Sequence, residues 1–94
     1  MTWAAFRLDA PPAIQTPAMP ASGTPVTNAN GVAVSVYLTP GALSPITALA
    51  INGSVIAGLT IAAGVLGGPI RLSAGSSITP TWSGVNPPTW QWLS

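Results

Sequence analysis

The fold of this chain is decided by residues 46–59, ITALAINGSVIAGL. Apolar residues dominate the stretch, and a helix of about 20 such residues would be long enough to span a membrane. At its centre, however, Asn52-Gly53 separates two apolar runs that contain β-branched residues. Asn and Gly both accept the positive φ of a type I′ turn, so the pair is a strong signal for a two-residue hairpin. The stretch therefore predicts two antiparallel strands, 46–51 and 54–61, joined by a tight turn.

A membrane helix over residues 46–68 is the competing interpretation. No charged residue occurs between Ala10 and Ile70, which would suit a bilayer. The interior of such a helix would be interrupted by glycine and proline, which are poor helix formers. These residues are Gly58, Gly64, Gly67, Gly68 and Pro69. The hairpin is therefore favoured, and a small holin-like membrane protein remains as the second alternative for the function.

Short strands separated by turn signals are expected on both sides of this hairpin. Residues 32–39 place Val32, Val34, Val36 and Leu38 on one face and Ala, Ser, Tyr and Thr on the other. This period of two is typical of a half-buried strand. The remaining predicted strands are 24–28, 70–72, 77–83 and 89–93, with 64–68 as a flexible connection. Seven short strands indicate an all-β fold, a small antiparallel β-sandwich or barrel.

Proline positions refine this organisation. Pro80 cannot donate a hydrogen bond to a ladder, which predicts that strand 77–83 lies at a sheet edge. Four prolines between positions 11 and 20 favour extended backbone and forbid a continuous helix. Residues 1–23 are therefore predicted to form an extended Pro-rich N-terminal arm, and residues 24–94 the β-sandwich domain. Large apolar residues in the arm are expected to anchor it on a partner: Trp3, Phe6 and Leu8.

The composition argues against catalysis. Among 94 residues there is no His, no Cys, no Lys and no Glu, and the charged residues are Arg7, Asp9 and Arg71. General acid–base catalysis needs a titratable group, and a Ser or Thr nucleophile needs an adjacent base. Zinc and calcium sites need several His, Cys or carboxylate ligands. We expect a protein that is not an enzyme and that holds no metal or cofactor.

The small number of charges also bears on partners. Two arginines and a net charge of +1 cannot neutralise many phosphates, so nucleic acid is not an expected partner. Charged residues make up 3% of the chain, against about 25% in typical soluble domains. An isolated domain with so little charge would have poor colloidal stability, which favours an assembly that covers its surface. The candidate subunit contact is the second, apolar strand of the hairpin, at Val55, Ala57, Leu59 and Ile61.

Three tryptophans form the remaining candidate site. Trp90 and Trp92 are two residues apart, so they share a face of the last strand, and Trp82 is expected to lie across from them. Such residues usually fill a core or an interface, because each buries a large area. A row of exposed tryptophans could instead stack on sugar rings. The set therefore predicts a core or interface, with glycan binding by a tail-tip or fibre module as the first alternative.

Several segments of the chain carry a resemblance to a known group of proteins. They are PASGTPVTN at 20–28, NGVAVSVYL at 30–38, AING at 50–53, LSAGSSI at 72–78 and PTWQW at 88–92. In this order they resemble small β-sandwich decoration and minor structural proteins of tailed bacteriophages that infect actinobacteria. Turn chemistry rather than a catalytic motif carries the similarity, which covers roughly residues 20–93. Residues 54–68 depart from it, since they are longer and more apolar than the family pattern.

The resemblance implies a structural virion protein, most concretely a capsid decoration (cement) protein that binds the outside of the phage head and stabilises it. The implied partner is the major capsid protein, and the implied assembly is a homo-oligomer, with a trimer favoured. The first residues, MTWAAFR, do not have the pattern of a secretory signal. The expected location is the capsid surface of the virion, after synthesis in the cytoplasm of a bacterial host.

Overall fold

The structure is a computed structural model that describes residues 14–94, so the candidate arm anchors Trp3, Phe6 and Leu8 lie outside the described residues. Every regular element in the described part is a strand. Within the same range, no helix is long and apolar enough to cross a membrane. The seven strands are β1 (Val26–Thr27), β2 (Val34–Thr39), β3 (Ile46–Ile51), β4 (Ser54–Val55), β5 (Gly67–Leu72), β6 (Ser77–Trp82) and β7 (Thr89–Leu93).

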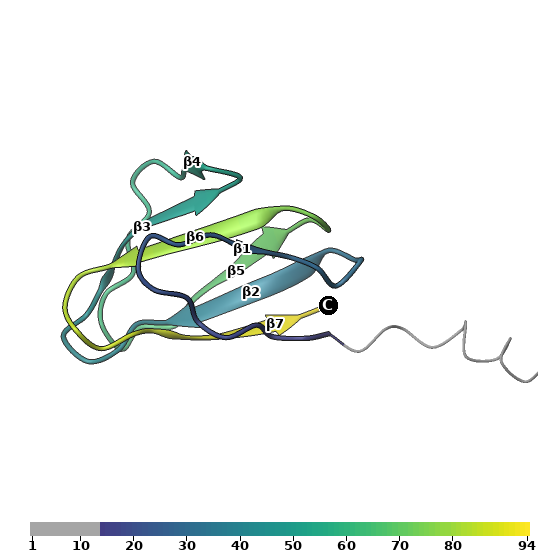
Figure 1. Cartoon of the computed structure of the whole chain (residues 1–94). Coiled ribbons are helices and arrows are strands. Elements are labelled where there is room, and N and C mark those ends of the chain that lie inside the picture. The colour runs from purple at the N-terminus through teal and green to yellow at the C-terminus, as the bar shows by residue number, and fades with distance from the viewer. Residues whose placement is uncertain (1–13) are drawn as a thin grey trace, which may run out of the picture.

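The strands form two antiparallel sheets that face each other (Figure 1). The four-stranded sheet has the order β1-β6-β3-β4, and the three-stranded sheet has the order β5-β2-β7. The sequence-based prediction of an all-β, sandwich-like fold with seven short strands is confirmed. Residues 46–68, the competing candidate for a membrane helix, instead contain β3, β4 and the start of β5.

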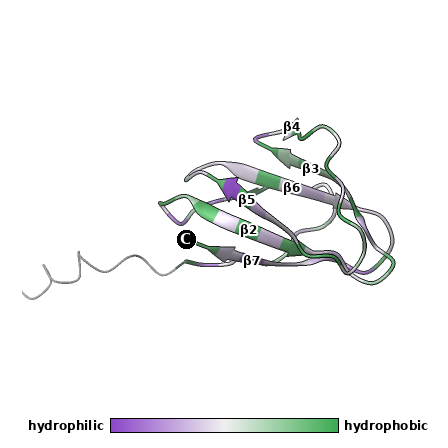
Figure 2. Cartoon of the chain, turned by 180° about the vertical axis from the view of Figure 1, so that it is seen from behind, coloured by the Kyte–Doolittle hydropathy of each residue, from purple (hydrophilic) through white to green (hydrophobic). Residues whose placement is uncertain are grey.

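Alternation along β2 builds the core of the three-stranded sheet. Val34, Val36 and Leu38 are fully buried, whereas the residues between them are partly exposed. Figure 2 shows the corresponding change between apolar and polar residues along this strand. The opposite sheet contributes fully buried side chains from β3 and β6, namely Ile46, Leu49 and Ile78. The core therefore lies between the sheets, where residues that alternate along each strand remove apolar area from water.

The Asn52-Gly53 turn forms as its chemistry predicts. Asn52 and Gly53 have φ values of 52° and 82°, the positive values that a type I′ turn requires at both positions. β4, however, ends at Val55 rather than continuing to residue 61. The chain turns away at Gly58, which has a φ of 76°, and returns at Ile61 to form an isolated bridge with Ile46. The predicted strand 54–61 is thus wrong beyond Val55.

β5 begins earlier than predicted, at Gly67 rather than at residue 70. Gly67 and Gly68 are therefore strand residues and not part of the predicted flexible connection. A Cβ at Gly68 would lie 2.6 Å from the carbonyl oxygen of Val36, and a Cβ at Gly67 would overlap the side chain of Ile61. The absence of side chains at these two positions is therefore what lets β5 pack closely against its neighbours.

β6 is an internal strand between β1 and β3, so the prediction that Pro80 marks a sheet edge is wrong. β1 is short and pairs only with Ser77 and Ile78, which leaves Pro80 beyond its end. The carbonyl oxygen of Pro80 accepts a hydrogen bond from the N–H of Gly23. In an antiparallel strand the N–H and C=O of one residue point to the same side. The Pro80 nitrogen, which has no hydrogen to donate, therefore points toward residue 23. The hydrogen bonds between β6 and β3 are not affected by it.

Residues 14–23 pack on the domain, although the sequence assigned them to the arm. We call this segment the strap. It runs beside β7 and then crosses to β6 in the other sheet (Figure 1). The hydroxyl oxygen of Thr16 accepts a hydrogen bond from the backbone N–H of Trp92 at 3.1 Å. Further along, the Ser22 hydroxyl accepts from the backbone N–H of Trp82 and donates to its carbonyl oxygen. The packed domain thus extends at least from residue 14.

Candidate interaction surface

Trp90 and Trp92 share a face of β7, as predicted, and that face points into the core. Their partners on β2 are Leu38 and Val36, two of the fully buried residues. The two indole rings meet edge to face, with centroids 5.2 Å apart and planes inclined by 70°. Trp92 is buried, and Trp90 is partly buried, with its Nε1–H donating to the carbonyl oxygen of Pro17 at 2.7 Å. This pair belongs to the core and its rim.

Trp82 lies on β6 in the other sheet, where it is partly buried and packs against the core. It shares the inward face of β6 with the buried residues Ile78 and Pro80. The three tryptophans therefore do not make a common exposed platform. Of the two roles considered for them, their positions favour the core, and they do not provide the stacking surface that glycan binding by these residues would require.

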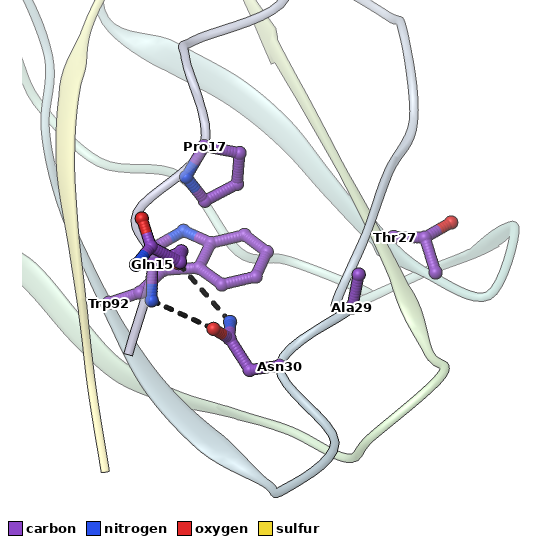
Figure 3. A pocket seen from close by; sticks show the side chains of 6 residues that line it. All are labelled: Gln15, Pro17, Thr27, Ala29, Asn30 and Trp92. Carbon is purple, nitrogen blue, oxygen red and sulfur yellow. Dashed lines mark hydrogen bonds between the residues drawn. The ribbon is translucent and has the colours of Figure 1, made fainter. Parts of the chain in front are cut away.

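A small pocket lies between the strap and Trp92 (Figure 3). Gln15 and Asn30 close one side with two reciprocal bonds: the Gln15 N–H donates to Oδ1 of Asn30 at 2.8 Å, and Nδ2 of Asn30 donates to the Gln15 carbonyl oxygen at 3.2 Å. The pocket has a volume of about 160 Å³, and its other lining residues are Pro17, Thr27, Ala29 and Trp92. The Nε1–H of Trp92 is buried and has no hydrogen-bond partner among the described residues. None of the lining groups is ionisable, so the pocket offers packing rather than chemistry.

β4 and the connection from it to β5 expose several apolar residues at the predicted subunit contact. Val55 is 65% exposed, and Ala57 is also exposed. Leu59 is only partly exposed, and Ile61 is buried in the core because it pairs with Ile46. The predicted contact is thus divided: Val55 and Ala57 are accessible to a partner, Leu59 is partly so, and Ile61 is not.

Two further residues of this connection were missed by the sequence analysis. Val65 and Leu66 are 52% and 64% exposed, although both are large and apolar. They lie in the segment that was interpreted as a flexible connection because of its glycines. Their size could have indicated this role. A solvent-exposed loop usually contains polar residues, whereas Val65 and Leu66 are large, apolar and flanked by Gly64 and Gly67. Exposed apolar groups that gather in this way often mark an interaction site.

A groove of about 380 Å³ runs between these residues and the start of β5. Its sides come from residues 59–62 and 65–70, and no charged side chain lines it. The position of the groove is fixed by the bridge between Ile46 and Ile61, whose backbones exchange two hydrogen bonds of 3.0 Å. We call this feature the β5 groove. It is a largely apolar depression, suited to holding an apolar side chain.

A polar hollow lies on the outer face of the three-stranded sheet. Its volume is about 420 Å³, and four of its side chains form two cross-strand pairs, Tyr37 with Gln91 and Thr39 with Thr89. All four carry neutral groups that can donate or accept hydrogen bonds. The hollow is therefore suited to a neutral polar ligand rather than to a charged one.

Charge is almost absent from the described residues, of which Arg71 alone is charged. Arg71 is exposed on β5, and its Nη1 donates to the hydroxyl of Ser35 at 3.2 Å. Between residues 14 and 94, no three His, Cys, Asp or Glu side chains come together as a metal site would need. Apart from Arg71, the described residues can therefore contact a partner only through apolar groups and neutral hydrogen bonds.

Comparison of the chain with protein-family models, with curated proteins and with solved structures found no match.

Proposed function

We propose that this chain is a structural virion protein, most concretely a capsid decoration protein that binds the outside of a phage head and stabilises it. The observation that carries the proposal is the exposure of large apolar side chains, among them Val55, Val65 and Leu66, on a domain whose described residues include a single charged side chain. A surface of this kind is costly in water and becomes favourable when a partner covers it. The proposal that the partner is a virion rests on the sequence resemblance.

The same features suit adhesion in many copies. Each Å² of apolar area removed from water contributes roughly 25 cal/mol, so an uncharged surface can bind without specific ion pairs. Copies arranged on a capsid lattice would multiply weak contacts through their effective concentration. The proposed partners are the major capsid protein and further copies of this chain, in a trimer. The role requires no catalysis and no cofactor.

The proposal is tested by separating phage particles from host membranes on a density gradient and quantifying the chain in each fraction by mass spectrometry. A decoration protein is expected to migrate with DNA-filled heads, at a copy number comparable to that of the major capsid protein. Migration with tails at low copy number, or with membranes, would refute the decoration role.

A second candidate, a tail-tip or fibre module that binds a cell-surface glycan, is favoured by a different site from the one that the sequence indicated. The hollow at Tyr37, Thr39, Thr89 and Gln91 combines an aromatic ring with neutral hydrogen-bonding groups. Titration of the purified protein with neutral oligosaccharides would test it. Binding that Gln91→Ala weakens, with the unfolding midpoint unchanged, would support this candidate over decoration.

A further inference from the structure

The β5 groove lacks a visible occupant from the described residues, and its chemistry restricts what could fill it. Leu59, Val65, Leu66, Pro69 and Ile70 supply much of its apolar wall. The groove is uncharged, but the strand that forms one side of it continues to Arg71, which is exposed. A fitting ligand would therefore present apolar side chains to the groove and an acidic group one step further along β5.

The chain itself contains such a segment. Residues 3–9 read WAAFRLD, with large apolar residues at Trp3, Phe6 and Leu8 and then Asp9. Asp9 is the only acidic residue of the chain, and Arg71 is the only cation among the described residues. With Leu8 against the groove and the segment running in the direction of β5, Asp9 would lie beside Arg71. A single placement of the segment thus puts Leu8 in the apolar groove and Asp9 next to Arg71.

The position of the strap indicates which copy supplies the segment. Thr16 lies beside Trp92 and Pro17 beside Trp90, so the strap runs antiparallel to β7 and residue 14 lies toward the Leu93 end. The register places Gly67, where β5 enters the groove, toward the other end of the sheet: Gly67 pairs with Leu38 and Leu38 with Trp90. Pro11-Pro12 stands between the anchors and the strap in the sequence, and consecutive prolines disfavour a tight reversal, which argues for binding to a second copy rather than to the same domain.

We propose that residues 3–9 of one copy bind the β5 groove of a second copy. The contact joins two different surfaces, the N-terminal segment and the groove, so it is a heterologous interface. Head-to-tail contacts of this kind generate closed rings when the rotation between subunits closes. The inference rests on the proposed structural role and deepens it, because it names the partner of this apolar surface and gives a geometric reason for a cyclic oligomer such as a trimer.

Disulfide crosslinking tests the contact directly, because the chain contains no cysteine. Leu8→Cys is combined with Leu66→Cys, which lies in the wall of the groove. Oxidation of the purified full chain is expected to give a ladder of covalent oligomers on a non-reducing gel that ends at the ring size. A monomer-sized product with an internal crosslink would show that each copy fills its own groove, and absence of any crosslink would show that the groove is not the site. Either result overturns the proposal.

The matched control combines Leu8→Cys with Ser54→Cys. Ser54 is exposed on β4 in the other sheet and differs from cysteine by one atom. The control pair is expected to give less than about a tenth of the crosslinked product, since a disulfide requires Cα atoms within about 7 Å. Equal yields from the two pairs would show unspecific collision and would refute the groove as the site.

Charge reversal tests the alignment without cysteines. Asp9→Arg and Arg71→Asp are each expected to raise the dissociation constant of the oligomer about three- to tenfold, because each places like charges together. The double variant is expected to restore association, as measured by sedimentation equilibrium. Additive losses in the double variant would overturn the pairing.

The outcome is independent of the test on phage particles. Loss of crosslinking while the chain still migrates with heads would refute the groove contact alone. Ring formation in solution without any migration with heads would refute the decoration role alone.

Discussion

Asn28 is a fully buried polar residue that joins the loop before β2 to the end of β5 and the turn that follows it. Its Nδ2 donates to the carbonyl oxygens of Val32, Leu72 and Ser73, at 2.8, 3.1 and 3.3 Å. Its Oδ1 accepts from the backbone N–H and the side-chain Nδ2 of Asn30, both at 3.0 Å. Buried polar groups are costly unless they are paired, and these contacts satisfy the asparagine and the loops around it at once.

We therefore predict that Asn28→Ala lowers the free energy of unfolding by about 2–3 kcal/mol, because it leaves buried carbonyl groups without donors. Urea unfolding followed by tryptophan fluorescence would measure the loss. Asn86→Ala is the matched control: this asparagine is exposed, and its side-chain amide donates to a single acceptor, the Ala42 carbonyl oxygen. Equal losses in the two variants would contradict the role given to Asn28.

Trp92 provides the second prediction at the residue scale. Its side chain is 2% exposed and belongs to the central cluster of apolar residues. Trp92→Ala is expected to cost about 3–5 kcal/mol of stability, since truncation of a core tryptophan removes apolar burial and leaves a cavity. Leu93→Ala, the next residue of β7 on its outer face, is expected to cost less than about 1 kcal/mol. Denaturant unfolding would compare them, and similar costs would argue against a core position for Trp92.

At the scale of elements, the strap is the feature that joins the two sheets outside the strands. It bonds to β7 through Thr16 and Pro17 and to β6 through Ser22 and Gly23. Ile14 and Met19 pack against the apolar core from the same segment. The strap therefore covers the rim of the core beside the paired tryptophans.

Deletion variants separate the strap from the residues that precede it. Removal of residues 1–20 is expected to lower the unfolding midpoint strongly and to shift tryptophan emission to longer wavelength, because Trp90 and Trp92 lose their cover. Removal of residues 1–13 is expected to leave the unfolding midpoint of the dilute protein nearly unchanged and to keep the emission at shorter wavelength than in the 1–20 deletion. Both variants lack Trp3, so their spectra are directly comparable. Identical behaviour of the two would refute a stabilising role for the strap.

At the scale of the whole molecule, the lack of titratable side chains predicts an unusual response to pH. Stability depends on pH only where the folded and unfolded states bind different numbers of protons. The chain has no histidine, and its one acidic side chain is Asp9. The free energy of unfolding is therefore expected to vary by less than about 0.5 kcal/mol between pH 6 and 9. Urea titrations across this range would measure it, and a larger slope would contradict the prediction.

Local patterns in the sequence were enough to determine the class of fold. Alternation in residues 32–39 placed Val34, Val36 and Leu38 on the buried face, and Asn52-Gly53 specified its turn. Both signals act within a few residues, because side chains alternate along any strand and only some residue types accept a positive φ. The small number of charged residues is also a property of the sequence alone, and it predicts a surface that a partner covers.

Tertiary structure alone decided where the strands end and what covers the core. Pro80 occupies an internal strand because β1 stops short of it, and Ile61 is buried because it returns to pair with Ile46. Val65 and Leu66 are exposed beside a groove that forms only when β5 packs against the chain near residue 61. The position of the strap and the inward orientation of Trp90 and Trp92 also depend on contacts between residues that are far apart in the sequence. Such long-range pairings leave no local pattern, since the same residue types could serve either a core or a surface until the opposite sheet is in place.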